Sequence, residues 1–165
     1  MNTSQRLCKM GCGRTCRPGL YKNSKPYDTC CGGCAKGQGH ESNCGRCLEY
    51  SMWHGTSRAA AYDIQKNGWR PSTGGALGPG VYVTRSKAKA MNYTKGSGRD
   101  NGAILELRVK TGTTKRITGQ GDSLRTTWAQ AGYDSAYAPA GAVGQREEDC
   151  IKNPANIQIV KVHVL

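Results

Sequence analysis

The sequence predicts an α+β fold of short strands and short helices, preceded by a small cysteine-rich module. Eight of the nine cysteines lie within residues 1–47. After that point the chain carries alternating and β-branched runs that are typical of strands. The predicted strands and helices do not alternate regularly, which favours α+β over a doubly wound parallel sheet. We place the module at residues 1–48 and the larger domain at residues 49–165.

The N-terminal module has too few aliphatic side chains to bury a core, so disulfides or metal ions must hold it. Because the first twenty residues lack the apolar segment of a secretory signal, zinc is favoured over four disulfides. Zinc takes four nitrogen or sulfur ligands, commonly as closely spaced pairs. The candidate ligands are Cys8, Cys12, Cys31, Cys34, His40 and Cys44, with Cys16, Cys30 and Cys47 ranked behind them.

The number of zinc ions depends on how two neighbouring cysteines are used. Cys30 and Cys31 are adjacent, so both would strain a single tetrahedral site. One of them is therefore expected at a second zinc ion or at none. We expect one or two structural ions.

The larger domain begins with a predicted strand over residues 50–54. Ser57 is a good N-cap for a helix over residues 58–66, because its hydroxyl can accept from a free backbone N–H. Gly68 follows as the residue that ends this helix in the left-handed region.

A glycine- and proline-rich loop follows over residues 69–80. The β-forming residues 81–83 predict a strand, and Ser86 predicts a second short helix that runs to Tyr93. Residues 95–102 are polar and glycine-rich and are expected to form another loop.

The C-terminal part is predicted to be mostly strand. In residues 103–110, Leu105, Leu107 and Val109 alternate with polar side chains, which indicates a strand with one buried face. A turn is expected around Trp128, ended by Gly132. Further strands are expected over residues 133–137, 148–152 and 157–164.

The net charge of +13, from 24 Lys and Arg against 11 Asp and Glu, favours anionic partners such as nucleic acid, nucleotides or acidic protein surfaces. The lysines and arginine at 87, 89, 95 and 99 are interpreted as a solvated face. No stretch approaches the ~18 apolar residues that a membrane span needs, so no membrane partner is expected. We expect an intracellular monomer, in the cytoplasm or the nucleus.

Four short motifs carry the functional signal, and each is weak alone. His54-Gly55-Thr56 ends the first strand, and the loop PSTGGALGPG follows at residues 71–80. Next come VYVT at 81–84 and KAKAMNY at 87–93, and EEDC lies at 147–150. In this order and spacing, residues 50–165 resemble the diphtheria-toxin-like ADP-ribosyltransferases, the poly(ADP-ribose) polymerase class. The resemblance is nearest to the small virus-inducible fish proteins of that class, whose pattern has no zinc-type N-terminus.

The resemblance implies a split, mostly antiparallel sheet and the catalytic signature His-Tyr-Glu, carried here by His54, Tyr82 and Glu148. His54 would bond a ribose hydroxyl of NAD⁺, and Glu148 would bond the 2′-hydroxyl of the nicotinamide ribose. Its carboxylate would stabilise the positive charge that develops when the nicotinamide–ribose bond breaks. Glu148 rather than Glu147 matches the family glutamate because of its distance from the last strand.

The resemblance also implies a set of residues that bind the dinucleotide. Gly55 would offer its backbone to the nicotinamide carboxamide, and Tyr93 and Tyr82 would enclose the ring. The remaining candidates are Thr56, Ala90 and Arg70, the last as a contact for the pyrophosphate.

The predicted function is that of an NAD⁺-dependent ADP-ribosyltransferase, a pentosyltransferase that modifies a protein or a nucleic acid with one ADP-ribose and releases nicotinamide. The alternative is a zinc-dependent nucleic-acid-binding protein whose second domain only binds NAD⁺ or ADP-ribose. Cys150 and His163 are interpreted as structural residues.

Overall fold

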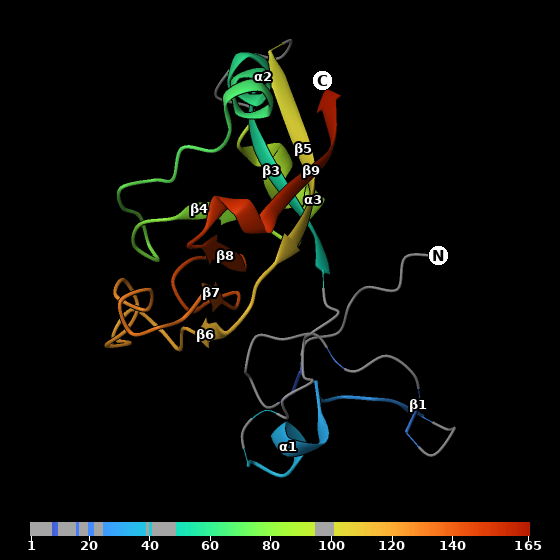
Figure 1. The fold of residues 1–165 in the computed structure, drawn as a ribbon, viewed down its shortest axis with the longest axis vertical. Helices are drawn as coiled ribbons and strands as arrows, with labels where there is room; N and C mark the ends of the chain where they lie inside the picture. The colour runs from blue at the N-terminus through green and yellow to red at the C-terminus, as the bar shows by residue number, and fades with distance from the viewer. Residues whose placement is uncertain are drawn as a thin grey trace. The chain divides into compact units, whose positions relative to one another are not determined.

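The computed structural model describes residues 8–9, 16, 20–21, 25–38, 40, 49–94 and 101–165. The chain divides into two compact units, residues Met1–Leu48 and Glu49–Leu165. Figure 1 shows the elements of each unit along the chain. Within the described residues, no helix is long and apolar enough to cross a membrane.

The described residues of the first unit contain two short strands and one short helix. Strand β1 (Leu20–Tyr21) pairs antiparallel with β2 (Lys25–Pro26). Helix α1 (Gly32–Ala35) begins after Cys31, whose sulfur accepts a hydrogen bond from the backbone N–H of Cys34.

The second unit is built on two sheets. The first is antiparallel and joins β3 (Glu49–Ser57), β5 (Gly102–Lys110) and β9 (Ile157–Val164), with β5 in the centre. The alternation expected in residues 103–110 is confirmed, because Leu105, Leu107 and Val109 are fully buried and Arg108 and Lys110 are exposed.

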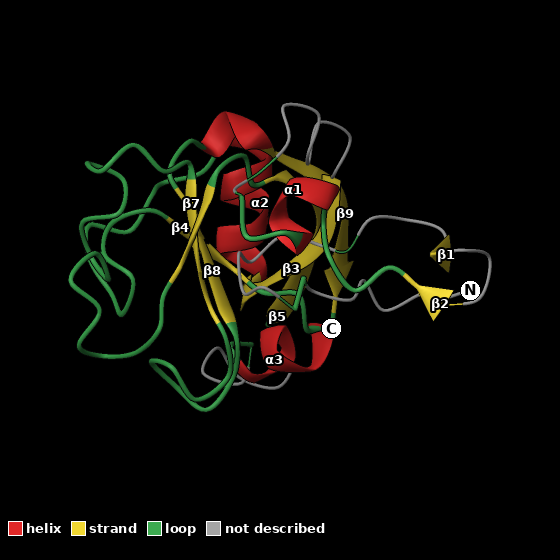
Figure 2. Cartoon of the chain, turned by 90° about the horizontal axis from the view of Figure 1, so that it is seen from below, coloured by secondary structure: helices red, strands yellow, loops and turns green. Residues whose placement is uncertain are grey.

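The second sheet has the order β4-β8-β7-β6. Its strands are β4 (Val81–Val83), β6 (Thr114–Arg116), β7 (Ser135–Ala138) and β8 (Glu148–Ile151). All pairs are antiparallel except β6 with β7, which is parallel. Figure 2 shows β4, β7 and β8 on one side of this unit and β3, β5 and β9 on the other. The α+β class with mostly antiparallel sheets is therefore confirmed.

Two α-helices lie among the described residues of the larger unit, and both start where the sequence predicts. Ser57 caps α2 (Arg58–Asn67), which ends at Gly68 with φ +86°. Ser86 caps α3 (Lys87–Asn92). Helix α2 packs on all three strands of the first sheet, and α3 packs on β3. A short 3₁₀ turn, η2 (Pro154–Asn156), leads into β9.

The core of the second sheet includes the loop that follows α2. The indole N–H of Trp128 donates to the carbonyl of Leu77 at 2.6 Å, which ties this loop to the turn expected around Trp128. Cys150 is fully buried beside both residues, in agreement with a structural role. His163 lies 2.8 Å from a carboxylate oxygen of Glu106 on the neighbouring strand.

The Arg85 guanidinium links elements of both sheets. It stacks between the rings of Tyr50 on β3 and Tyr137 on β7, with its central carbon 4.7 and 4.6 Å from the ring centres. It also donates two hydrogen bonds, of 3.0 and 3.1 Å, to the carboxylate of Asp149 on β8. Asp149 is fully buried. A charge in such a place is tolerable only when it is paired.

We predict that Arg85→Met lowers the free energy of unfolding by about 3–5 kcal/mol, because it leaves the Asp149 carboxylate buried without its cation. The double variant R85M/D149N should recover part of this loss, since it removes the unpaired charge. Urea denaturation of both variants measures the difference. A double variant that is less stable than R85M alone would contradict this explanation.

Gly55 allows α3 to lie directly against β3. A Cβ at this position would overlap the backbone carbonyl of Ala90, which a side-chain rotation cannot relieve. The residue is therefore needed for packing, apart from any contact that its backbone makes with a ligand.

Gly55→Ala is accordingly expected to lower the free energy of unfolding of the larger unit by about 1–3 kcal/mol, the usual cost of forcing extra atoms into a packed region. Gly74→Ala is the matched control, because a Cβ there meets nothing within 4 Å and needs no unusual backbone angle. Thermal unfolding should separate the two variants clearly. Equal melting temperatures would show that α3 can move away from β3 at little cost.

Candidate active site

A cavity of about 280 Å³ opens where the two sheets of the larger unit meet. Side chains from β3, the loop after α2, β4, α3 and the start of β8 line it. Five of the predicted site residues are among them, namely His54, Gly55, Tyr82, Tyr93 and Glu148. Trp53, Ser72, Thr84 and Lys89 also line the cavity, although the sequence analysis did not select them.

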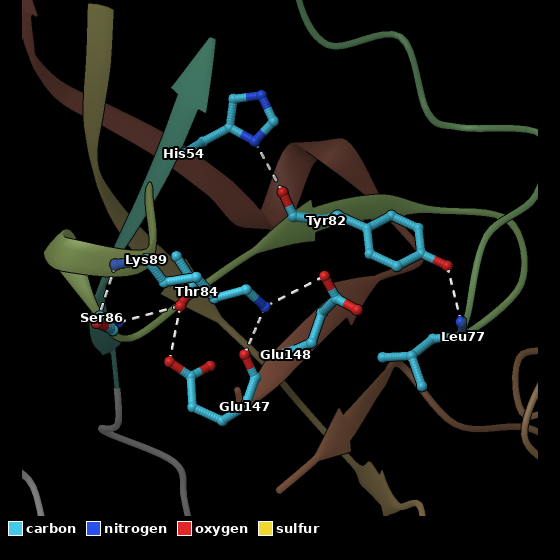
Figure 3. A network of polar contacts seen from close by, with 8 residues as sticks. All are labelled: His54, Leu77, Tyr82, Thr84, Ser86, Lys89, Glu147 and Glu148. Atoms are coloured by element: carbon cyan, nitrogen blue, oxygen red, sulfur yellow. Dashed lines mark hydrogen bonds and ion pairs between the residues drawn. The ribbon is translucent and has the colours of Figure 1, made fainter. Parts of the chain in front are cut away.

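His54 is held in one orientation and one tautomer. Its Nδ1 lies 2.8 Å from the backbone carbonyl of Tyr82 (Figure 3). A carbonyl can only accept, so Nδ1 carries the proton and Nε2 of the neutral ring is an acceptor. Burial lowers the pKa of His54, which keeps the ring neutral at pH 7. The ring also meets the edge of Trp69, at 5.1 Å between ring centres.

Tyr82 uses its hydroxyl to hold the loop after α2. The hydroxyl donates to the carbonyl of Gly78 at 2.7 Å and accepts from the backbone N–H of Leu77 at 2.9 Å. Burial raises the pKa of Tyr82, so the group stays protonated. Because both bonds go to the backbone, Tyr82 presents its ring, rather than an acid or a base, to the cavity.

Glu148 is paired with a buried lysine. The amine of Lys89 lies 3.2 Å from Oε1 of Glu148 and donates to the backbone carbonyl of Glu147 at 2.6 Å. Figure 3 shows this amine pointing between the two acceptors. The arrangement fixes one oxygen of Glu148 at the edge of the cavity.

The assignment of Lys89 to a solvated face was wrong, because its side chain is only 8% exposed. Two acceptors at the cavity edge allow the charged amine to be buried. A signal was present in the sequence, since Lys89 lies four residues before Tyr93 and such residues share one helix face. Lys87 lies over the ring of Trp53, at 5.1 Å from its centre, while residues 95 and 99 lie outside the described part of the chain.

Glu147 has different surroundings from Glu148. Its carboxylate accepts a hydrogen bond of 2.7 Å from the hydroxyl of Thr84, and it is absent from the cavity lining. Burial raises the pKa of Glu147, an effect that the Thr84 hydroxyl opposes. The two glutamates point in different directions, as neighbours in an extended segment do.

Three predicted residues lie outside the main cavity. Ala90 is fully buried next to Gly55, and Thr56 lies further along β3. Arg70 forms an ion pair of 3.1 Å with Asp63.

Arg70 lines a second cavity, of about 330 Å³, together with Trp69 and residues of α2. His54, Ser72 and Tyr82 line both cavities. The two cavities therefore adjoin one another at His54.

Four of the described cysteines of the first unit form a cluster. Cys8, Cys30, Cys31 and Cys34 are buried together, and their cluster includes no other hydrophobic residue among those described. Cys30, ranked low from the sequence, lies close to both Cys8 and His40. Cys16 is half-buried, whereas Cys12, Cys44 and Cys47 lie outside the described residues. His40 Nδ1 lies 3.4 Å from the sulfur of Cys30.

Comparison with known proteins identifies the family of this chain. Residues 31–161 match the family model described as poly(ADP-ribose) polymerase catalytic domain. A curated protein from Gallus gallus, named Protein mono-ADP-ribosyltransferase PARP3, is 33% identical over 89 residues, which cover 53% of this chain. The match covers 16% of that protein's length. The chain belongs to the family of poly(ADP-ribose) polymerase catalytic domains.

Proposed function

We propose that this protein transfers a single ADP-ribose from NAD⁺ to a protein or a nucleic acid and releases nicotinamide. The observation that carries the proposal is that His54, Tyr82 and Glu148, from three distant parts of the sequence, line one cavity. Membership of the family supports this chemistry. The name of the chicken relative supports transfer of one unit rather than a polymer.

The nicotinamide end of NAD⁺ occupies the main cavity in this proposal. The ring of Tyr82 covers one side of the nicotinamide and Tyr93, which is 57% exposed, covers the other. Aromatic faces suit this role because they bind a flat ring by stacking. The backbone of Gly55 bonds the carboxamide.

The ribose and phosphate groups extend past His54 into the adjoining cavity. Nε2 of the neutral His54 accepts a hydrogen bond from a ribose hydroxyl, which its fixed tautomer allows. Arg70 at the second cavity offers a positive charge to the pyrophosphate.

In the reaction, the bond between C1′ of the ribose and the nicotinamide nitrogen breaks, and its electron pair neutralises the pyridinium ring. Positive charge develops on the ribose. The Glu148 carboxylate, held by Lys89, stabilises that charge and bonds the 2′-hydroxyl. The acceptor nucleophile then attacks C1′ and loses its proton.

We expect Glu148→Gln to slow nicotinamide release by about 10²–10³-fold, because it removes a preorganised charge without changing the shape of the side chain. NAD⁺ binding should change little. The rate is measured by chromatography of nicotinamide, and mass spectrometry of added proteins, DNA and RNA identifies the acceptor.

Glu147→Gln is the matched control and should retain most of the rate, since Glu147 is absent from the cavity lining. The assignment of the two glutamates is wrong if Glu147→Gln abolishes release while Glu148→Gln does not. A wild-type protein that binds NAD⁺ without any release or transfer would support the alternative of a binding protein.

We also propose that residues 1–48 hold structural zinc that takes no part in NAD⁺ chemistry. The buried cysteines with His40 beside them supply the soft ligands that zinc prefers. All residues that line the main cavity belong to the other unit. Zinc binding supplies the folding energy that this unit cannot obtain from a hydrophobic core.

Elemental analysis should therefore find zinc in protein purified under reducing conditions. A strong chelator should remove it and increase proteolysis within residues 1–48, while hydrolysis of NAD⁺ in the absence of an acceptor continues. Metal-free protein with defined disulfides would rule out the zinc module. Loss of NAD⁺ hydrolysis on chelation would contradict the separation of the two sites.

A further inference from the structure

Among the described residues of the first unit, the possible metal-binding atoms fall into two overlapping groups. The sulfurs of Cys8, Cys30 and Cys34 lie within 4.8 Å of one another. Cys30, Cys31 and His40 form a second group under the same limit. Cys30 is common to both.

The distances within the groups match ligands of one metal ion. Two sulfurs at about 2.3 Å from a tetrahedral zinc lie about 3.8 Å apart, and a sulfur and an imidazole nitrogen lie about 3.5 Å apart. The sulfurs of Cys8 and Cys34 are separated by 3.6 Å. His40 Nδ1 lies 3.4 Å from the sulfur of Cys30 and 3.8 Å from that of Cys31.

The five candidate ligand atoms of these two groups do not match the ligand shell of a single zinc ion. All four ligands of a tetrahedral zinc would lie within about 3.8 Å of one another. In the described part of the chain, neither Cys31 nor His40 belongs to the group of Cys8 and Cys34. If all five residues are ligands, two metal positions are needed, and Cys30 is the residue common to both groups.

The burial of Cys30 supports a bridging role. Cys30 is 6% exposed and lies among buried sulfurs rather than in an apolar core. A deprotonated thiolate has enough lone pairs to bind two metal ions at once. A bridging Cys30 would share the second ion with the adjacent Cys31, contrary to the sequence-based expectation that the two would not share one; their sulfurs nevertheless lie within 4.8 Å of one another.

We propose that the first unit holds two neighbouring zinc ions bridged by the thiolate of Cys30. Cys8 and Cys34 bind the first ion, and Cys31 and His40 bind the second. Binding releases the thiol protons. This inference rests on the proposed zinc module and is independent of the proposed transferase activity.

The test uses the full chain with zinc replaced by ¹¹³Cd, a spin-½ metal of similar coordination chemistry. The bridge predicts two cadmium ions per chain and two ¹¹³Cd resonances that are split by scalar coupling through the shared sulfur. Proton–cadmium correlation should connect the β-protons of Cys30 to both resonances.

Cys30→Ser should lower the metal content below two ions and abolish the coupling. Cys150→Ser is the control, since Cys150 is buried in the other unit, and both ions and their coupling should remain. Because the spectrum of the unchanged chain is decisive, the test holds even if Cys30→Ser fails to fold.

Two uncoupled resonances would overturn the bridge, and a single ion would overturn the two-metal arrangement. Absence of any metal would overturn this inference and the zinc module together. Each of these results leaves the assignment of the NAD⁺ site unaffected.

Discussion

Three consecutive acidic side chains at the start of β8 are each paired with a residue of the segment from the end of β4 through α3, and the arrangement of the candidate active site depends on this pairing. Thr84 donates to Glu147, Lys89 to Glu148 and Arg85 to Asp149. Like charges so close together would repel if they faced the same way. Because each carboxylate has its own partner, the three side chains point in different directions and their mutual repulsion is reduced.

The same segment joins the two sheets. Backbone hydrogen bonds of 2.7 and 2.9 Å in both directions connect Trp53 on β3 with Thr84, immediately after β4. His54 follows Trp53, and its ring is held by the carbonyl of Tyr82. The histidine, the tyrosine and the glutamate therefore meet only when both sheets are formed and joined. The stability of the contact between the two sheets therefore also determines whether the three side chains come together.

Local signals in the sequence predicted much of this fold. Ser57 and Gly68 mark the ends of α2 because capping depends on neighbouring residues alone. The alternation in β5 likewise gives its buried face. Strand β6 was not predicted, because three residues without alternation become a strand only by pairing with β7.

In the candidate site too, some residues could be predicted from local sequence, whereas others depend on contacts between distant parts of the chain. The motifs selected His54, Tyr82 and Glu148. The spacing of Lys89 from Tyr93 could place both on one helix face, but the burial of Lys89 depends on two acceptors almost sixty residues away in sequence. Cys31 and Cys34 are only three residues apart in sequence, yet the structure places them in different groups. The spacing of cysteines in the sequence indicates which residues could bind zinc, but the fold decides which of them lie close enough to bind the same ion.

The most direct measurement is a crystal structure of the full chain with a non-hydrolysable analogue of NAD⁺. The account predicts the nicotinamide ring between Tyr82 and Tyr93, and a ribose hydroxyl within hydrogen-bond distance of the Glu148 carboxylate. A second ribose hydroxyl should donate to Nε2 of His54. A nicotinamide ring bound outside this cavity, or a Glu148 carboxylate without contact to the ribose, would contradict the account.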